Sequence, residues 1–197
     1  MNIIIGLTGP TGSGKSSASI LCEELGFKHI DCDIISRKAV EKGTEGLKSV
    51  VAAFGNSILN SDGTLNRKEL ARLAFSSPEN TELLNSTIFP FIRQLVEKET
   101  QNGKILLDAP TLFESGINEI CYKTIAVLSD WKIRLERIIL RDNLTETEAL
   151  LRMNAGKDDN FYLKKANYII YNNKTEEEFV TELRSVLNEI LEKGENL

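Results

Sequence analysis

The chain alternates short apolar runs with longer amphipathic segments. Residues 2–8 carry Ile3, Ile4, Ile5 and Leu7 without alternation, a pattern typical of a strand that is buried on both faces of a parallel sheet. Further short apolar runs predict strands at residues 28–31, 104–109, 123–128 and 167–172. The segments between them predict helices at 15–25, 130–142 and 175–192. Strands that alternate with helices predict a doubly wound, three-layer α/β fold around a five-stranded parallel sheet.

Two stretches depart from this alternation. The first, residues 36–103, has a mostly helical pattern, with helices predicted at 46–54, 66–75, 78–85 and 90–100 and with Pro78 and Pro90 in first-turn positions. The second, residues 143–165, is polar and begins with a Thr145–Glu148 capping box. We therefore expect a core made of residues 1–35, 104–142 and 166–197, a helical insertion at 36–103 and a lid at 143–165.

The composition is that of an ordinary globular protein. Of 197 residues, 41% are hydrophobic and 27% are charged, and the net charge is −5. This acidic balance argues against non-specific nucleic-acid binding, which needs a basic surface. No apolar run approaches the roughly 20 residues of a membrane span, and the cysteines (Cys22, Cys32 and Cys121) have no zinc-binding spacing. We expect a cytoplasmic protein with reduced thiols, a monomer or weak homo-oligomer, without a membrane partner.

A glycine-rich segment from Gly9 to Ser16 fits the pattern G-x-x-x-x-G-K-[ST]. It follows a predicted strand and opens a predicted helix, which is the context that a phosphate-binding loop (P-loop) requires. We expect its backbone N–H groups to hold the phosphates of a nucleoside triphosphate, Lys15 to reach the β- and γ-phosphates, and Ser16 to ligate Mg²⁺. The predicted nucleotide-binding residues of this loop are Gly12, Ser13, Gly14, Lys15, Ser16 and Ser17. The fold is then expected to be that of the P-loop NTPases.

Carboxylates follow two of the predicted strands. Asp31 and Asp33 end the second strand, and ligands bind beyond the carboxyl ends of strands in open α/β sheets. We expect Asp33 to act as general base toward an acceptor hydroxyl and Asp31 to support it or contact the acceptor. The alternatives for Asp33 are helix capping and holding Mg²⁺ through water. Asp108 follows an apolar run in a position suited to orienting Mg²⁺, with turn capping as its alternative. Phe113 and Glu114 are expected to line the acceptor pocket.

Arginines recur on the predicted helix that leads into the lid. Arg134, Arg137 and Arg141 are spaced three and four residues apart, so one helix face presents all of them. Arginines can stabilise the charge on a phosphoryl group in transfer, and we expect Arg141 to do so because it lies where the helix enters the lid. The alternative is a solvated face that pairs with Glu136 and Asp142. His29, the sole histidine, is expected to be structural.

Over almost its whole length, the chain resembles one family, the dephospho-coenzyme A kinases. The matching segments are "GLTG..GSGKSS", "GF.HIDCDIISR", "FG..IL..DGTLNRKELARLAF", "DAPTLFESG" and "ANYIIYNN". The resemblance implies transfer of the γ-phosphoryl group of ATP, with Mg²⁺, to the 3′-hydroxyl of the ribose of dephospho-CoA. It also implies that residues 36–103 bind the acceptor, that the lid closes over ATP, and that Asp33 is the base. The acceptor-binding residues expected on this basis are Asp31, Asp33, Arg67, Phe89, Leu112, Phe113 and Glu114.

The chain also departs from the pattern of the family it resembles. Departures occur at Pro10 and Thr11 in the loop and at Phe89, Thr111, Gly156 and Asn167 elsewhere. They leave Lys15, Ser16, Asp33 and Arg141 in place. Two other functions therefore remain as alternatives: a kinase with another small acceptor on the same fold, and a nucleotide-binding switch that has lost transfer activity.

Overall fold

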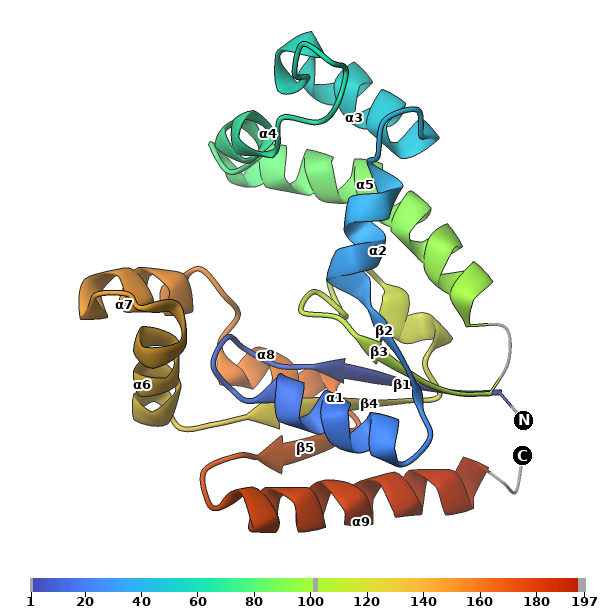
Figure 1. The fold of residues 1–197 in the computed structure, drawn as a ribbon, viewed down its shortest axis with the longest axis vertical. Helices are drawn as coiled ribbons and strands as arrows, with labels where there is room; N and C mark the ends of the chain where they lie inside the picture. The colour runs from blue at the N-terminus through green and yellow to red at the C-terminus, as the bar shows by residue number, and fades with distance from the viewer. Residues whose placement is uncertain (1, 101–102, 195–197) are drawn as a thin grey trace. The chain divides into compact units, whose positions relative to one another are not determined.

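A five-stranded parallel sheet organises the computed structural model, which describes residues 2–100 and 103–194 (Figure 1). Its strands are β1 (Asn2–Thr8), β2 (Lys28–Asp31), β3 (Gly103–Asp108), β4 (Lys123–Leu128) and β5 (Tyr168–Tyr171). Their order is β2-β3-β1-β4-β5, with β1 paired in parallel to both β3 and β4. This confirms the predicted α/β class. The carboxyl end of β1 lies at the centre of the sheet, where the order of strands reverses and open sheets bind ligands.

Alternate side chains of β4 show how the sheet is covered on both faces. Ile125 and Val127 pack with a cluster from α1 (Lys15–Glu24) and α9 (Glu176–Gly194), whereas Ala126 and Leu128 pack with Tyr162 of α8 (Asp159–Lys165). Because successive strand residues point to opposite faces, α1 and α9 cover one face and α8 covers the other (Figure 1). The three-layer arrangement follows from the uninterrupted apolar runs in the strands.

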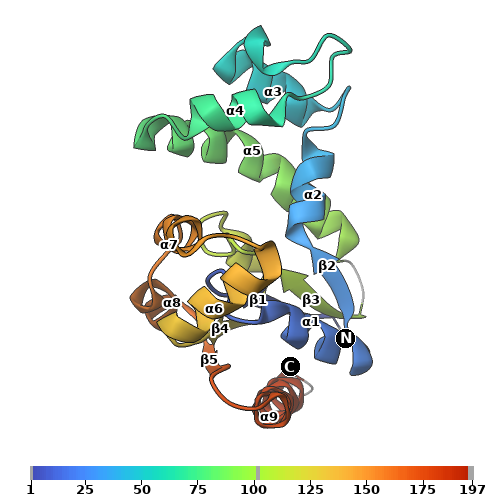
Figure 2. The same ribbon diagram turned by 60° about the vertical axis from the view of Figure 1, so that its left-hand side comes forward.

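Two further helices, α6 (Trp131–Asp142) and α7 (Glu146–Asn154), follow β4 and precede α8 in the chain, and they lie side by side (Figure 2). Leu135 and Ile138 of α6 pack against Ala149 and Met153 of α7. The predicted Thr145–Glu148 capping box is confirmed. The short 3₁₀-helix η2 (Ile117–Ile120) precedes β4. No helix in the described ranges is long and apolar enough to cross a membrane.

The described residues from Asp31 to Thr100 form a second compact unit, separate from the unit that contains most of the sheet. Its helices are α2 (Cys32–Ala39), α3 (Glu45–Phe54), α4 (Arg67–Ala74) and α5 (Pro78–Glu99), with the 3₁₀-helix η1 (Asn56–Ile58). Its core contains Val40, Leu47, Val50, Ile58, Leu70 and Ala74. The predicted helical character of this region is correct.

One prediction in this unit is wrong. The sequence predicts separate helices at 78–85 and 90–100, but α5 runs without a break from Pro78 to Glu99 with Pro90 inside it. Proline lacks the N–H that a helix interior uses, so the sequence pattern predicts a helix start at Pro90. The helix continues because residues on both sides of Pro90 are packed: Leu84 and Ile88 border the unit's core, and Ile92 and Val96 are buried. The ribbon of α5 changes direction along its length (Figure 1), as a proline in a helix interior would cause.

Candidate functional site

The loop between β1 and α1 carries the glycine-rich segment, and its backbone fits an anion. Gly14 is the N-cap of α1 with φ = 97°, in the left-handed region that residues with a Cβ rarely adopt. Within the described residues, no side chain caps this helix. The first N–H groups of a helix have no partner inside the helix and lie at its positive end. The loop therefore presents backbone donors at a position that favours phosphate.

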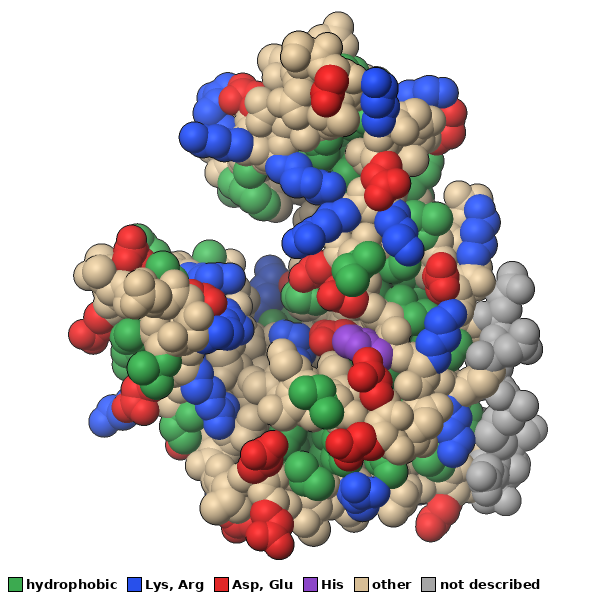
Figure 3. Space-filling view, viewed as in Figure 1, with side chains coloured by type: hydrophobic (Ala, Val, Ile, Leu, Met, Phe, Trp, Pro, Cys, Tyr) green, Lys and Arg blue, Asp and Glu red, His purple; other side chains and the backbone are tan. Residues whose placement is uncertain are grey.

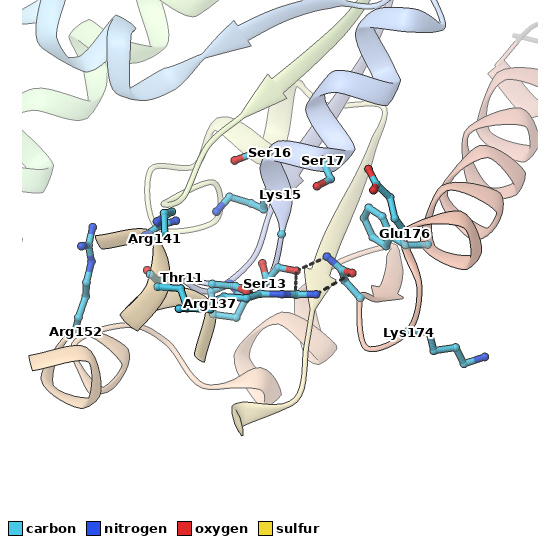
Figure 4. A pocket seen from close by; sticks show the side chains of 16 residues that line it. Thr11, Ser13, Lys15, Ser16, Ser17, Arg137, Arg141, Arg152, Lys174 and Glu176 are labelled. Atoms are coloured by element: carbon cyan, nitrogen blue, oxygen red, sulfur yellow. Dashed lines mark hydrogen bonds between the residues drawn. The ribbon is translucent and has the colours of Figure 1, made fainter. Parts of the chain in front are cut away.

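A cavity of about 780 Å³ lies against this loop (Figure 4). Lys15 lines it, with its Nζ 3.2 Å from the Gly9 carbonyl oxygen. The other lining residues come from the loop, from α6 and α7, and from the segment after β5: Pro10, Thr11, Gly12, Ser13, Gly14, Ser16, Ser17, Arg137, Leu140, Arg141, Arg152, Asn172, Lys174, Glu176 and Phe179. Cationic side chains outnumber the single carboxylate, so the cavity suits an anionic ligand. Its volume is in the range of small-molecule sites.

The arginines of α6 divide into two roles. Arg134 is buried, and its Nε donates to the Thr11 carbonyl (3.0 Å) while Nη1 donates to Oδ1 of Asp159 (3.3 Å). Burial holds the pKa of Arg134 below its usual value. Arg137 Nη1 lies 3.5 Å from the Gly12 carbonyl oxygen and 3.4 Å from that of Ser13. Both arginines bond to loop carbonyls, but Arg137 also lines the cavity, as Arg141 does. The prediction that one helix face presents all three to phosphate therefore needs correction at Arg134, which is buried against the loop and does not line the cavity.

Arg141 lines the cavity and pairs with its neighbour. Its Nε and Nη2 each lie 2.8 Å from the carboxylate of Asp142, and Nη1 of Arg152 lies 2.6 Å from the same carboxylate. The hydrogen bond from Arg141 lowers the pKa of Asp142 and raises that of Arg141 itself. The pairing of Arg141 with Asp142, one part of the alternative, is therefore present. Both arginines remain about half exposed at the cavity, and a role for Arg141 in catalysis stays a prediction.

Asp108 ends β3 among polar partners. Its Oδ2 accepts a hydrogen bond from the Ser19 hydroxyl of α1 (3.1 Å) and lies 3.8 Å from Nε2 of His29. His29 Nδ1 lies 2.9 Å from a carboxylate oxygen of Glu23. The histidine, purple in Figure 3, has acidic side chains beside it. The sequence placed Asp108 at a strand end correctly but did not show that Ser19 and His29 surround it.

The acidic pair Asp31 and Asp33 lies where β2 meets α2. Asp31 is the N-cap of α2, and its Oδ1 accepts from the backbone N–H of Asp33 (2.7 Å) and of Ile34 (3.2 Å). The strand ends at Asp31, as predicted, and the residue that caps the helix is Asp31 rather than Asp33. Asp33 lies exposed in the first turn of α2. In the same unit, Arg67 is exposed at the start of α4 and Phe89 is half-buried on α5.

The three acceptor-site candidates after β3, Leu112, Phe113 and Glu114, differ in their surroundings. Leu112 is fully buried, and its side chain occupies the space beside Gly6 where a Cβ would lie. The expectation that Leu112 touches an acceptor is therefore corrected: it is a core residue. Phe113 packs edge-on against Phe161 at 6.0 Å between ring centres. Oε2 of Glu114 is buried without a hydrogen-bond partner among the described residues. Burial and the charge of Glu114 raise the pKa of Tyr162 to about 12.

Sequence reasoning missed the contribution of the segment after β5. Asn172 follows β5 directly and is buried, while Lys174, Glu176 and Phe179 complete the same side of the cavity. The Asn172 side chain donates to the Ser13 carbonyl (3.0 Å) and accepts from Nη2 of Arg137 (3.3 Å). The position of Asn172 was a usable signal, because residues just beyond parallel strands meet at the ligand-binding edge.

The chain is similar in sequence and in fold to known proteins. The model of the dephospho-CoA kinase family matches residues 3–178. A dephospho-CoA kinase of Listeria monocytogenes is 39% identical over 181 residues, covering 89% of this chain and 90% of that protein. Among solved structures, the Thermus thermophilus protein TT1252 superposes with a TM-score of 0.79 at 31% identity, covering 95% of this chain and 97% of its own. The dephospho-CoA kinase of Campylobacter jejuni gives a TM-score of 0.70 at 28% identity, covering 98% and 100%.

Proposed function

The chain belongs to the dephospho-CoA kinase family, and on that premise we propose that it phosphorylates the 3′-hydroxyl of the ribose of dephospho-CoA. ATP donates the γ-phosphoryl group, and the products are CoA and ADP. The observation that carries the proposal is the P-loop cavity lined by Lys15, Arg137, Arg141 and Arg152 in a chain of this family. A cationic, amide-lined cavity of this size suits the polyphosphate of the donor.

Three side chains have proposed roles in the transfer. Asp33 takes the proton of the 3′-hydroxyl as the oxygen bonds to the γ-phosphorus. The bond from that phosphorus to the β–γ bridging oxygen breaks, and ADP leaves. Lys15 and Arg141 offset the negative charge on the phosphate oxygens during this exchange. The exposure of Asp33 in the first turn of α2 is compatible with this role.

We propose that Mg²⁺ accompanies ATP. In residues 2–100 and 103–194, no three His, Cys, Asp or Glu side chains are grouped so as to hold a metal ion. This fits an ion that takes most of its ligands from phosphate and water. The exposed hydroxyl of Ser16 would supply one oxygen, with Asp108 orienting bound water. When bound, the ion neutralises charge on the β- and γ-phosphates.

The acceptor is proposed to bind through residues of the helical region and of the segment after β3. The candidates are Asp31, Asp33, Arg67, Phe89, Phe113 and Glu114. Leu112 leaves this set because it is fully buried. The closing of residues 143–165 over ATP likewise remains a prediction.

An ADP-release assay with alternative acceptors tests the reaction. Dephospho-CoA is expected to stimulate ADP release from ATP far more than AMP, dCMP, adenosine or shikimate do. A preference for a nucleoside monophosphate would contradict the proposed acceptor. ATP binding without ADP release for any acceptor would instead support a nucleotide-binding switch.

An Asp33→Asn variant tests the base. The amide cannot take a proton, so we expect kcat to fall by about 10²–10⁴ while the Kd for ATP stays unchanged. Glu45→Gln is the matched control, since Glu45 is also an exposed carboxylate in the first turn of its helix, α3. Equal kcat values for the two variants would remove Asp33 from the mechanism.

A further inference from the structure

Three consecutive peptide carbonyls of the P-loop accept hydrogen bonds from side chains that lie outside the loop in sequence. The Thr11 carbonyl accepts from Arg134, and the Gly12 carbonyl accepts from Arg137. The Ser13 carbonyl accepts from both Arg137 (3.4 Å) and Nδ2 of Asn172 (3.0 Å). The holding side chains come from α6 and from the segment after β5, far from the loop in sequence.

The orientation of the Ser13 carbonyl determines that of the next N–H group. In a trans peptide unit, the C=O and the following N–H point in opposite directions, and no cis peptide occurs among the described residues. When the Ser13 carbonyl points toward Asn172, the Gly14 N–H must point the opposite way. That N–H belongs to the N-cap of α1, where phosphate-binding donors are needed.

Asn172 is built to hold this orientation. It is 7% exposed, its backbone N–H donates to the Leu128 carbonyl (2.8 Å), and its own carbonyl accepts from the Ser129 hydroxyl (2.9 Å). Its Oδ1 accepts from Arg137 Nη2 (3.3 Å). Because a guanidinium can only donate and a carbonyl can only accept, the Asn172 amide has one workable orientation, with its NH₂ toward Ser13.

We propose that Asn172 is a positioning residue for phosphate binding: by holding the Ser13 carbonyl, it directs the Gly14 N–H toward the donor's phosphates. The proposal depends on the proposed function only in that the ligand of the loop is a polyphosphate. Asn172 lies outside the Gly9–Ser16 segment that fits the P-loop pattern, so the proposal assigns phosphate positioning to a residue that this pattern does not include. Asn172 acts through the loop backbone.

Binding of tripolyphosphate to an Asn172→Leu variant tests the proposal. Leucine is similar in size, adds no charge and removes the donor to Ser13. We expect the Kd for tripolyphosphate and for ATP to rise about tenfold, the equivalent of one net hydrogen bond, and the Kd for adenosine to stay unchanged. Asn173→Leu is the matched control, because Asn173 pairs with Asp130 and not with the loop. If the Leu variant fails to fold, Asn172→Ser provides the same comparison.

The Gly14 amide gives a second readout that a purely structural role would not change. In an ¹⁵N-labelled protein, tripolyphosphate is expected to shift the Gly14 amide resonance in the wild type and in Asn173→Leu. That shift should be lost or much reduced in Asn172→Leu. An undiminished Gly14 shift, or equal losses of affinity for tripolyphosphate and adenosine, would overturn the proposal. Neither measurement uses the acceptor, so failure to phosphorylate dephospho-CoA would contradict the proposed function alone.

Discussion

Gly14→Ala is the substitution whose cost the loop geometry predicts most directly. Gly14 has φ = 97°, and a Cβ there would overlap Nδ2 of Asn172. The left-handed backbone costs a residue with a Cβ about 1–2 kcal/mol. Asn172 is held at both ends of its amide, so it can move only by breaking its bond to Ser13. That change takes the buried Nδ2 of Asn172 away from its acceptor, at a cost of about 1–3 kcal/mol. Alanine also reduces the conformational freedom of the unfolded chain, which offsets part of these two costs. The expected loss in the free energy of unfolding is therefore about 2–4 kcal/mol.

Thermal unfolding followed by circular dichroism measures this loss. In a chain of this length, 1 kcal/mol corresponds to a shift of about 2–4 °C in Tm. Gly26→Ala is the control, because Gly26 has a similar φ of 82° but open space around its Cβ position. It should therefore lose only the backbone part, about 1 kcal/mol.

Two results would refute the reasoning about Gly14. Equal Tm shifts for Gly14→Ala and Gly26→Ala would mean that Asn172 moves aside at no cost. Strict additivity of Gly14→Ala with Asn172→Ser would mean the same, since residues in contact should couple. We expect the double variant to be less destabilised than the sum of its parts.

Three further outcomes are expected. Lys15→Ala should raise the KM for ATP and lower kcat, and an unchanged KM would remove Lys15 from ATP binding. Burial raises the pKa of the Cys22 thiol to about 12. The contribution of the protonated, buried thiol to the free energy of unfolding is therefore complete below pH 9 and is lost as pH rises toward 12. Tm should fall more steeply above pH 9 in the wild type than in Cys22→Ala. Thr145→Ala removes the side-chain cap of α7 and should cost about 1 kcal/mol in urea unfolding, whereas exposed Thr111→Ala should cost little.

Local patterns predicted those parts of the fold that local physics controls. The uninterrupted apolar run of β1, the Thr145–Glu148 capping box and the glycine spacing of the P-loop were all readable, because burial, capping and backbone freedom depend on neighbours in sequence. Pro90 was misread for the complementary reason. Its effect on the helix is local, but packing on both sides of it keeps α5 continuous.

The candidate site was predictable in its chemistry but not in its contacts. Residue type and position make Lys15, Arg141 and the strand-end Asp108 site candidates, and their roles stay predictions. Arg134 has the same residue type and helical spacing as Arg141 but bonds to the loop backbone. Leu112 stood in a matching segment, and only its complete burial showed that it belongs to the core. Residue type limits what a side chain can bind, whereas burial and direction determine what it meets.

The amino-acid sequence by itself determined the α/β class, the phosphate-binding loop and the resemblance to one family of kinases. These follow from periodicity and short motifs, whose physical meaning is contained within a few neighbouring residues. Only the tertiary structure decided that Arg137 and Asn172 hold the Ser13 carbonyl, because those residues are separated from the loop by 124 and 159 positions. Their meeting depends on the strand order, which brings β1 beside β4 and β4 beside β5. No local pattern encodes that order, since it results from how the apolar faces of all the elements pack together.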